Sequence, residues 1–584
     1  MQDITQTAIA ELAQAASGWA HRWMPSGKAT APSAIVASPK PLVTGNPDHA
    51  RQIYQGRFTL AGTQIDTGAK SPFGFDAAPD DWRTALSSFS WLGDLAAAES
   101  ELARAQARWL ITDWIETQPR KRSIDWSVAV LADRLIAWLA HAPFYLTNAG
   151  ETFHRTLMAS IGCQIQHLQR TLPGIRMGTA RLHGVVALNQ ALVCTEGLEK
   201  HHAHAANLLG AALDRQILPD GGHVSRNPAL AAEVLADLLP LKACFAERQI
   251  EPPDALVGTI DRLYPFLRMF LHGDQGLAFF NGASETSRKM IALLLAQDTE
   301  RARPLSFAHQ SGYGRLAQGQ SVIIADIGAT RSARDSDTGH AGALSFEMSH
   351  GKQRIVVNCG HCATGPHEWR MATSGTAAHS TLAIGDRSSA RTIRHPAVIA
   401  LFGGPLNFGP DMVTADIQPS DAGLLLSARH NGYVNAFGLS HHREIYLAAD
   451  GLDIRGEDQL IAAEDPPAIA HPFATRFHLH PSIKANMSKD NQSILLMLPD
   501  RTGWKFSARG AQVALEESVY FADRDVPHRT LQIVLSGKTA GSCAVQWAFK
   551  AIEKVAVAPD QQRPKLTRLP LRGGGMNDAG DERQ

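Results

Sequence analysis

The stretch GHAGALSFEMSHGKQRIVVNCG, at residues 339–360, decides the fold of the second half of the chain. Leu344, Phe346 and Met348 alternate with polar residues, which is the period of a β-strand that buries one face. A polar turn then leads into the apolar run at residues 355–357. The pattern predicts a β-hairpin with one side packed against a core.

The same two-residue period continues from about residue 305 towards the C-terminus. Short aliphatic runs such as SVIIADI (321–327), REIYLAAD (443–450) and LQIVLSG (531–537) are separated by turns rich in Gly, Asp, Asn and Pro. Strands of this kind, without helical segments between them, are typical of antiparallel sheets packed face to face. We therefore expect an antiparallel β-sandwich over residues 306–555.

The first half of the chain has the spacing of helices. In TALSSFSWLGDLAAAESELARAQARWLITDWI, at residues 84–115, Trp, Leu, Ile and Ala recur at intervals of three and four. Similar segments follow one another over residues 81–300 with short breaks, which suits antiparallel helix pairs in an (α/α) toroid-like domain. The predicted fold is therefore an α+β multidomain chain, with this helical domain followed by the β-sandwich.

The two ends of the chain differ from these domains. Residues 1–80 form an N-terminal extension that starts with a predicted amphipathic helix. That start lacks the basic region and apolar core of a signal peptide, so we expect a cytoplasmic location. Residues 556–584 lack aromatic anchors and are predicted to be a disordered tail.

The composition argues against several functional classes. Lys and Arg together number 56, as do Asp and Glu, so no excess positive charge favours a nucleic-acid partner. No run approaches the roughly 18 apolar residues of a membrane span. Six cysteines in 584 residues do not suggest a disulfide framework. The sequence leaves the oligomeric state open.

A second segment, TAAHSTLAIGD at residues 376–386, follows the hairpin. Together they resemble the heparinase II/III-like polysaccharide lyases, whose β domain carries HxHxDxLSFEL, VDxG and then TxAHNTL. The order of helical toroid and β-sandwich is also similar to that family, over residues 80–550. The resemblance implies a lyase that cleaves an acidic, uronic-acid-containing polysaccharide by β-elimination and needs no cofactor for this chemistry. It also gives the cell envelope or periplasm as an alternative location.

The resemblance further implies a structural zinc site in the β domain. The two histidines and the aspartate that bind zinc in the family match His340, His379 and Asn358. Imidazole and carboxylate bind zinc at about 2.0–2.2 Å, whereas a neutral amide is a weaker donor. Asp386 could replace the missing carboxylate, or the residues could form a hydrogen-bonded network without an ion.

Two more matches bear on catalysis. His183, in RLHGVVALNQALV, matches the His of the family's NH-x-L segment, whose Asn position is Leu182 here. At the hairpin, Thr338 stands at the first His of HxHxD and Gly342 at its Asp. His340 is then the imidazole that the motif retains.

The segment LPDGGHVSRNPAL, at residues 218–230, resembles the family's DGGHFExSPMY. The catalytic Tyr of that motif falls at Leu230, which cannot move a proton. Arg226 could hold a uronate carboxylate through two hydrogen bonds, and Tyr433, in RHNGYVNAFG, is the best replacement for the missing Tyr. The predicted proton-transfer residues are His183, His223, His340 and Tyr433, and the predicted substrate-binding residues are Arg226, Asn227 and Arg370.

Other functions remain open at this stage. The loss of the Tyr at Leu230 favours a catalytically silent glycan-binding or envelope-related protein of the same fold. Paired carboxylates such as Glu285 and Asp220 would suit a sugar hydrolase. Cys359 and Cys362 form a CxxC motif, but a Gly-Pro loop follows it instead of a helix, which argues against redox chemistry.

Overall fold

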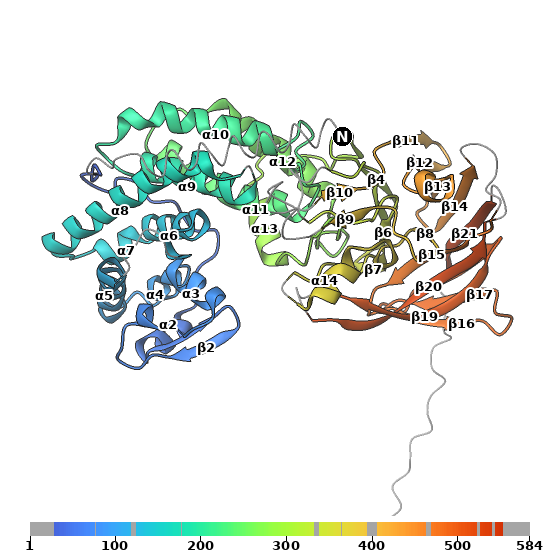
Figure 1. The fold of residues 1–584 in the computed structure, drawn as a ribbon, viewed down its shortest axis with the longest axis horizontal. Coiled ribbons are helices and arrows are strands. Elements are labelled where there is room, and N and C mark those ends of the chain that lie inside the picture. The colour runs from blue at the N-terminus through green and yellow to red at the C-terminus, as the bar shows by residue number, and fades with distance from the viewer. Residues whose placement is uncertain are drawn as a thin grey trace, which may run out of the picture.

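The computed structural model describes residues 29–75, 77–117, 124–176, 178–331, 338–363, 365–393, 406–462, 469–521, 526–539 and 543–552. It consists of a helical half followed by a β half, joined side by side (Figure 1). This confirms the predicted fold class. The predicted N-terminal amphipathic helix and the predicted disordered tail both lie outside the described residues.

The helical half contains long helices in antiparallel succession, preceded by a small hairpin (Figure 1). Its helices are α2 (Pro47–Tyr54), α3 (Asp80–Ser87), α4 (Leu92–Ala97), α5 (Glu101–Thr117), α6 (Val128–Ala140), α7 (Ala142–Leu146), α8 (Glu151–Thr171), α9 (Thr179–Cys194), α10 (His202–Gln216), α11 (Ala229–Glu247), α12 (Asp254–Met269) and α13 (Arg288–Ala296). The hairpin consists of β1 (Arg57–Leu60) and β2 (Thr63–Asp66).

Large aromatic residues at helical spacing fill the centre of this half. Trp82, Trp114 and Trp138 are almost completely buried, and their apolar area supplies much of the driving force for packing. Arg134 is buried among them, with its guanidinium carbon 3.9 Å from the Trp114 ring centroid. It donates to the backbone oxygens of Ser87 and Asp125, so its charge is held by peptide dipoles instead of a carboxylate.

The β half is a sandwich of two antiparallel sheets. The first has the strand order β19-β20-β15-β7-β6-β5-β4-β3, with β8 also paired to β15, and the second has the order β11-β12-β13-β14-β21-β18-β17-β16. The strands of the first sheet are β3 (Phe307–Ala308), β4 (Tyr313–Gln318), β5 (Ser321–Asp326), β6 (Phe346–His350), β7 (Gln353–Val357), β8 (Leu382–Ile384), β15 (Pro472–Leu479), β19 (Gln512–Tyr520) and β20 (His528–Lys538).

The strands of the second sheet are β11 (Val413–Ser420), β12 (Gly423–His430), β13 (Leu439–Ala448), β14 (Asp453–Ala462), β16 (Lys484–Met487), β17 (Ser493–Met497), β18 (Gly503–Arg509) and β21 (Cys543–Ile552). The short helix α14 (His367–Ser374) connects β7 to β8 of the first sheet, and α16 (Val434–Phe437) connects β12 to β13 of the second. The pair β9 (Arg391–Ile393) and β10 (Leu406–Phe408) lies between β8 and β11, where the chain passes from one sheet to the other. Inward-facing aromatic residues join the sheets. Phe346 stacks on Trp547 with centroids 5.5 Å apart, and Phe477 packs against both.

The hairpin predicted at residues 339–360 is confirmed as β6 and β7, with a turn in which Gly351 has a φ of +53°. Its polar side, however, does not face solvent. Glu347 and Ser349 are buried because the loop after α12 covers them. The alternation of apolar and polar residues predicted that one face of β6 is buried in the sandwich core. It could not predict that the helical half covers the opposite, polar face of the strand.

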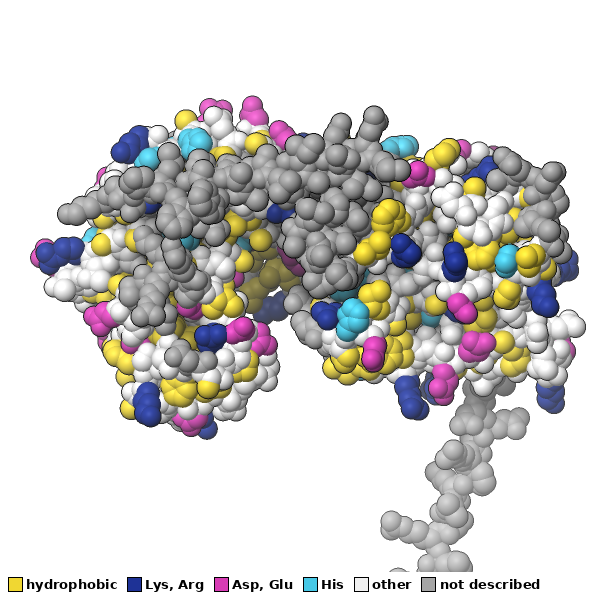
Figure 2. Space-filling view, in the orientation of Figure 1, with side chains coloured by type: hydrophobic (Ala, Val, Ile, Leu, Met, Phe, Trp, Pro, Cys, Tyr) yellow, Lys and Arg dark blue, Asp and Glu magenta, His cyan; other side chains and the backbone are white. Residues whose placement is uncertain are grey.

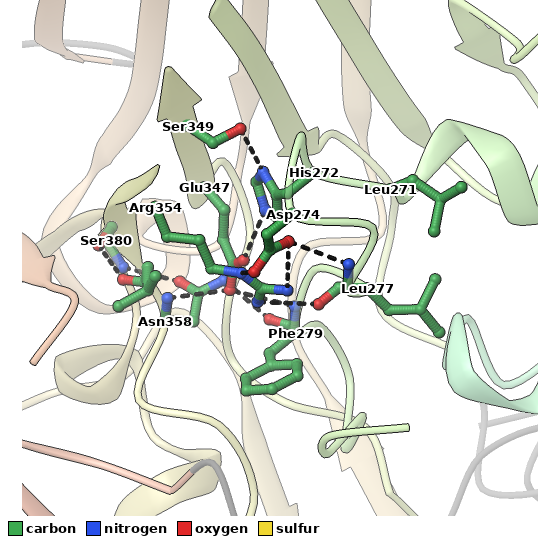
Figure 3. A network of polar contacts seen from close by, with 12 residues as sticks. Leu271, His272, Asp274, Leu277, Phe279, Glu347, Ser349, Arg354, Asn358 and Ser380 are labelled. Atoms are coloured by element: carbon green, nitrogen blue, oxygen red, sulfur yellow. Dashed lines mark hydrogen bonds and ion pairs between the residues drawn. The ribbon is translucent and has the colours of Figure 1, made fainter. Parts of the chain in front are cut away.

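The two halves meet through a buried polar network (Figure 3) and through apolar packing of Phe270 and Phe280 on Tyr313. The Glu347 carboxylate accepts hydrogen bonds from the backbone N–H groups of Phe279 and Asn358, at 3.1 Å each, and from His272 Nε2 at 3.0 Å. Beside it, Arg354 donates to Asp274 at 3.0 Å. These bonds fix the orientation of the hairpin relative to the helical half. Below the region where the halves join, a hollow separates them (Figure 2).

Candidate functional site

Three histidines line up at the start of the hairpin. His340 Nδ1 lies 3.1 Å from His379 Nε2, and His340 Nε2 lies 3.2 Å from His361 Nδ1. His379 Nδ1 lies 2.7 Å from the oxygen of Gly375, so this nitrogen must carry a proton. The chain then runs in one direction, with His361 Nδ1 donating to His340 Nε2 and His340 Nδ1 donating to His379 Nε2. Burial lowers the pKa of His379, which keeps this inner ring neutral.

The predicted approach of His340 and His379 is thus confirmed, and the departure at Gly342 explains part of it. A Cβ atom at Gly342 would lie 2.7 Å from His379 Cδ2, closer than real contacts allow. The aspartate that the family carries at this position therefore does not fit beside the ring as it stands. His361 joins the cluster unpredicted, because the sequence presented it only as the spacer of a CxxC motif.

The predicted zinc ligands do not form a suitable donor set. The Asn358 side chain accepts from the Ser380 backbone N–H at 3.0 Å and donates to the Phe279 oxygen at 2.9 Å, so both ends of its amide are engaged. His340 faces its two neighbours with different ring nitrogens, which one ion cannot bridge. Within the described residues, no group of three or more His, Cys, Asp or Glu side chains could hold a metal ion. The geometry fits a hydrogen-bonded network better than zinc.

A small cavity of about 20 Å³ brings the hairpin and the DGGH segment together. Ser225 and Arg226 from the helical half line it, together with Gly339 and His340 from the β half. The backbone N–H of His340 also donates to Asn281 Oδ1 at 3.3 Å. The resemblance places four loops, at residues 181–184, 220–228, 338–342 and 429–433, on facing walls of one cleft, and this cavity brings the second and third of them together.

A larger groove of about 730 Å³ shares the lining residues Thr330, Arg331 and Ala390 with this cavity. Arg387 and Arg391 also line it, and its further lining residues are Ser388, Ser389, Phe408, Gly409, Asp411, Asn431, Gly432 and Asn435. Among these residues three arginines stand against one aspartate. The groove is therefore locally basic although the chain has no net charge.

Arg226, the predicted carboxylate binder, is committed to holding the two halves together. Its guanidinium donates to the oxygens of Ser311, Gly312 and Gly328 and forms a buried ion pair with Asp326. A Cβ atom at Gly328 would lie 2.4 Å from Arg226 Nη2, so the close approach requires glycine. With its donors used internally, Arg226 has none left for a substrate carboxylate, which corrects its predicted role.

His223 and Asn227 are also engaged within the protein. His223 Nδ1 accepts from the backbone N–H of Ser225 at 3.1 Å, and its Nε2 lies 3.1 Å from Gln216 Oε1. Burial lowers the pKa of His223 to about 4, so the ring is neutral at pH 7. Asn227 Oδ1 accepts from the backbone N–H of Ala229, the first residue of α11. These internal hydrogen bonds stabilise the loop.

His183 lies within the helical half, between two carboxylates. Its Nδ1 is 2.7 Å from Asp237 on α11, and its Nε2 is 2.8 Å from Asp133 on α6. Burial opposes a charge on His183, but the two carboxylates outweigh it and raise the pKa to about 10. An imidazolium at pH 7 cannot accept a proton, so the structure assigns His183 to linking three helices instead of acting as a base.

Tyr433 and Arg370 belong to different elements of the β half, at α16 and α14. Tyr433 is buried in the sandwich core, where its hydroxyl donates to the Leu382 oxygen at 2.9 Å and burial raises its pKa. A buried phenol with a raised pKa is a poor general base. Arg370 is exposed on α14.

The alternative sites do not assemble either. Asp220 accepts from the backbone N–H groups of Gln310 and Ser311 and so anchors the β half, which leaves Glu285 without a partner carboxylate for hydrolysis. Burial raises the pKa of the Cys359 thiol to about 12, so it is not an activated nucleophile. Within the described residues, no helix has the length and apolar character needed to cross a membrane.

Comparison with known proteins agrees with this architecture. A family model described as heparinase II/III-like, C-terminal, matches residues 300–548. FtsZ-localized protein C of Caulobacter vibrioides is 32% identical over 519 residues, covering 87% of each chain. The crystal structure of heparinase III superposes with a TM-score of 0.70 at 13% identity, over 94% of this chain and 91% of that one.

The heparan sulfate lyase HepC of Pedobacter heparinus gives a TM-score of 0.61 at 13% identity, over 92% of this chain and 87% of that one. At such identities these two structures establish the fold alone. The family model covers the β half, and the relative from Caulobacter extends the likeness through the helical half. This chain therefore belongs to the heparinase II/III-like family.

Proposed function

We propose that this chain is a non-cleaving member of the heparinase II/III-like family that acts together with FtsZ. The proposal rests on the residues at the expected catalytic positions, which are either replaced by unreactive side chains or engaged in contacts within the protein. Leu230 and Thr338 occupy positions where the family has a Tyr and a His, and neither can act as a base at pH 7. Arg226 is bound internally, in a buried ion pair with Asp326.

β-Elimination needs a base for the C5 proton, a group that neutralises the adjacent carboxylate and an acid for the leaving oxygen. His223, His183 and Tyr433 were the expected proton-transfer groups besides His340. His183 is already protonated at pH 7, and Tyr433 is a buried phenol whose pKa is raised. His223 is neutral, but both of its ring nitrogens are engaged by Ser225 and Gln216, and its lowered pKa makes it a weak base. The proposal of a partnership with FtsZ is supported by the name of the relative from Caulobacter, with which this chain shares 32% identity.

Three measurements test this function. A fluorescent fusion in the organism that encodes the chain should co-localise with FtsZ, and the purified protein should co-sediment with FtsZ polymers. Incubation with a panel of acidic polysaccharides should give no unsaturated uronate, which is detected by ultraviolet absorbance. A diffuse fusion that fails to co-sediment would refute the partnership, and an ultraviolet-absorbing product would refute the absence of cleavage.

The second candidate is the polysaccharide lyase itself, acting on an acidic glycan. It is favoured by the histidine chain, which lies beside the basic groove. His361 Nδ1 donates inward to His340 Nε2, which makes His361 the outer ring of the chain. A proton accepted there can be stabilised through His340 and His379, while Arg387 and Arg391 hold the carboxylates of the glycan.

Substitution separates this candidate from the first. If the chain is a lyase, His361→Ala and His340→Ala should each lower turnover by about 10² to 10⁴-fold, as loss of a true acid or base does. His367→Ala, on the exposed face of α14, is the matched control and should keep full activity. Activity that survives both substitutions would exclude the histidine chain from the chemistry.

A further inference from the structure

A groove of about 1220 Å³ lies on the outer face of the second sheet, away from the histidine chain and the basic groove. Its floor is formed by β12, β13, β14, β21 and β18, and its walls by residues 490–493 and 509–513. Sites for drug-sized ligands usually measure about 300–1,000 Å³, so this groove can hold an extended ligand.

Strand register places the polar side chains of the floor in rows. Glu444 on β13 pairs with Glu457 on β14, Glu457 pairs with Gln546 on β21, and Gln546 pairs with Arg509 on β18. In the next row, Tyr446 pairs with Arg455. Directly paired residues on adjacent strands point to the same side, so these groups form one continuous polar surface.

The pair of glutamates is an unusual arrangement in a sheet. Like charges directly opposite each other on neighbouring strands destabilise a sheet. Gln459 and Gln546 donate to the two carboxylate oxygens of Glu457, which holds its pKa below the usual range and fixes its orientation. The Glu444 carboxylate lies 3.9 Å from His442 Nε2, and among the described residues no Lys or Arg forms an ion pair with it. The orientation of the Glu457 carboxylate is therefore fixed, and it lies next to the Glu444 carboxylate. The fold itself does not require two carboxylates in this arrangement.

We propose that this groove binds a neutral oligosaccharide. Carboxylate, amide and guanidinium groups are planar and present paired hydrogen-bonding positions that suit the neighbouring hydroxyls of a sugar. The partly exposed ring of Tyr446 offers an apolar surface, and its hydroxyl is held by the Ala422 oxygen at 2.5 Å. Among the lining residues, three acidic side chains are balanced by three basic ones: Glu444, Glu457 and Asp490 against Arg455, Lys505 and Arg509. The groove therefore has no excess positive charge to favour an acidic glycan, and it differs in this from the basic groove. The inference does not depend on the proposed function.

The test measures binding of neutral β-linked hexose and N-acetylhexosamine hexamers to the full chain by calorimetry, with an acidic hexamer for comparison. Glu444→Gln combined with Glu457→Gln should weaken binding of the neutral hexamer at least tenfold, because the amides change the hydrogen-bonding pattern. The unfolding temperature of the double variant should fall only slightly, because the two hydrogen bonds to the Glu457 carboxylate lie at the surface. Asp416→Asn, on the exposed β11 outside the groove, is the matched control and should bind like the parent chain.

Several results would overturn the proposal. These are no binding of any neutral hexamer at millimolar concentration, equal binding by the double variant, or a preference for the acidic hexamer at this groove. Binding of Ca²⁺ alone that is abolished by the double substitution, with no sugar bound, would identify a cation site instead. If the acidic hexamer binds the parent chain but not the Arg387→Ala variant, that binding occurs in the basic groove. Such binding does not count as a preference for the acidic hexamer at the groove tested here.

Discussion

His183 should make the stability of the helical half depend on pH. Its pKa is raised from an ordinary value near 6.5 to about 10 by Asp133 and Asp237, against the opposing effect of burial. Because the folded pKa is above the unfolded one, the stabilisation is complete below about pH 6.5 and is lost as pH rises through about 10. The largest possible contribution, at about 1.4 kcal/mol for each pKa unit, is roughly 5 kcal/mol.

The real contribution should be smaller because Asp133 is 49% exposed and water screens its charge. We expect His183→Gln to lower the free energy of unfolding by about 1–3 kcal/mol at pH 7 and by much less at pH 10. Urea unfolding followed by Trp fluorescence at pH 6.5, 8 and 9.5 measures this difference, and other titrating groups cancel between the two proteins. A parent-minus-variant difference that stays constant across this range would show that His183 is not held as an imidazolium.

Further predictions concern the buried polar contacts. Arg443→Met should cost about 3–5 kcal/mol in urea unfolding, because it leaves the buried Asp458 carboxylate without its main counter-charge; a loss below 1 kcal/mol would contradict this. His272→Ala should cost about 1–3 kcal/mol by removing one donor to Glu347, and proteolysis should then cut between the two halves sooner. Arg226→Lys should lower the unfolding temperature, since Lys cannot make the same set of hydrogen bonds, and an unchanged temperature would free this residue for ligand binding. Cys359 should react slowly with a thiol reagent at pH 8 in the folded protein, and fast labelling would reopen a reactive role.

The order of the two domains and the hairpin were predictable because hydrophobic periodicity is a local property. The period of 3.6 around Trp114 and Trp138 and the period of two around Phe346 report which side of each element is buried. Periodicity does not indicate which other part of the chain packs against that buried side. The role of Glu347 could not be predicted for this reason, because its partners His272 and Phe279 come from the other domain.

The candidate site was predicted in part. The meeting of Arg226 and His340 followed from motif order, and the structure bears it out. The protonation states of His183 and His223 could not follow, because they depend on partners far along the chain or on burial. His361 was not predicted, because in the sequence it is only a spacer residue between Cys359 and Cys362, and its contact with His340 forms only in the folded chain.

The motif positions that identify the family are, in this chain, largely the positions that hold its two domains together. Glu347 of the LSFE segment anchors the loop after α12, and Asp220 and Arg226 of the DGGH segment bind the start of the β half. Selection for a stable interface is then sufficient to retain these residues, whether or not any substrate is cleaved. A match to such motifs supports the fold and says little about turnover. The residues that can decide turnover are those that face the basic groove, because the interface does not need them.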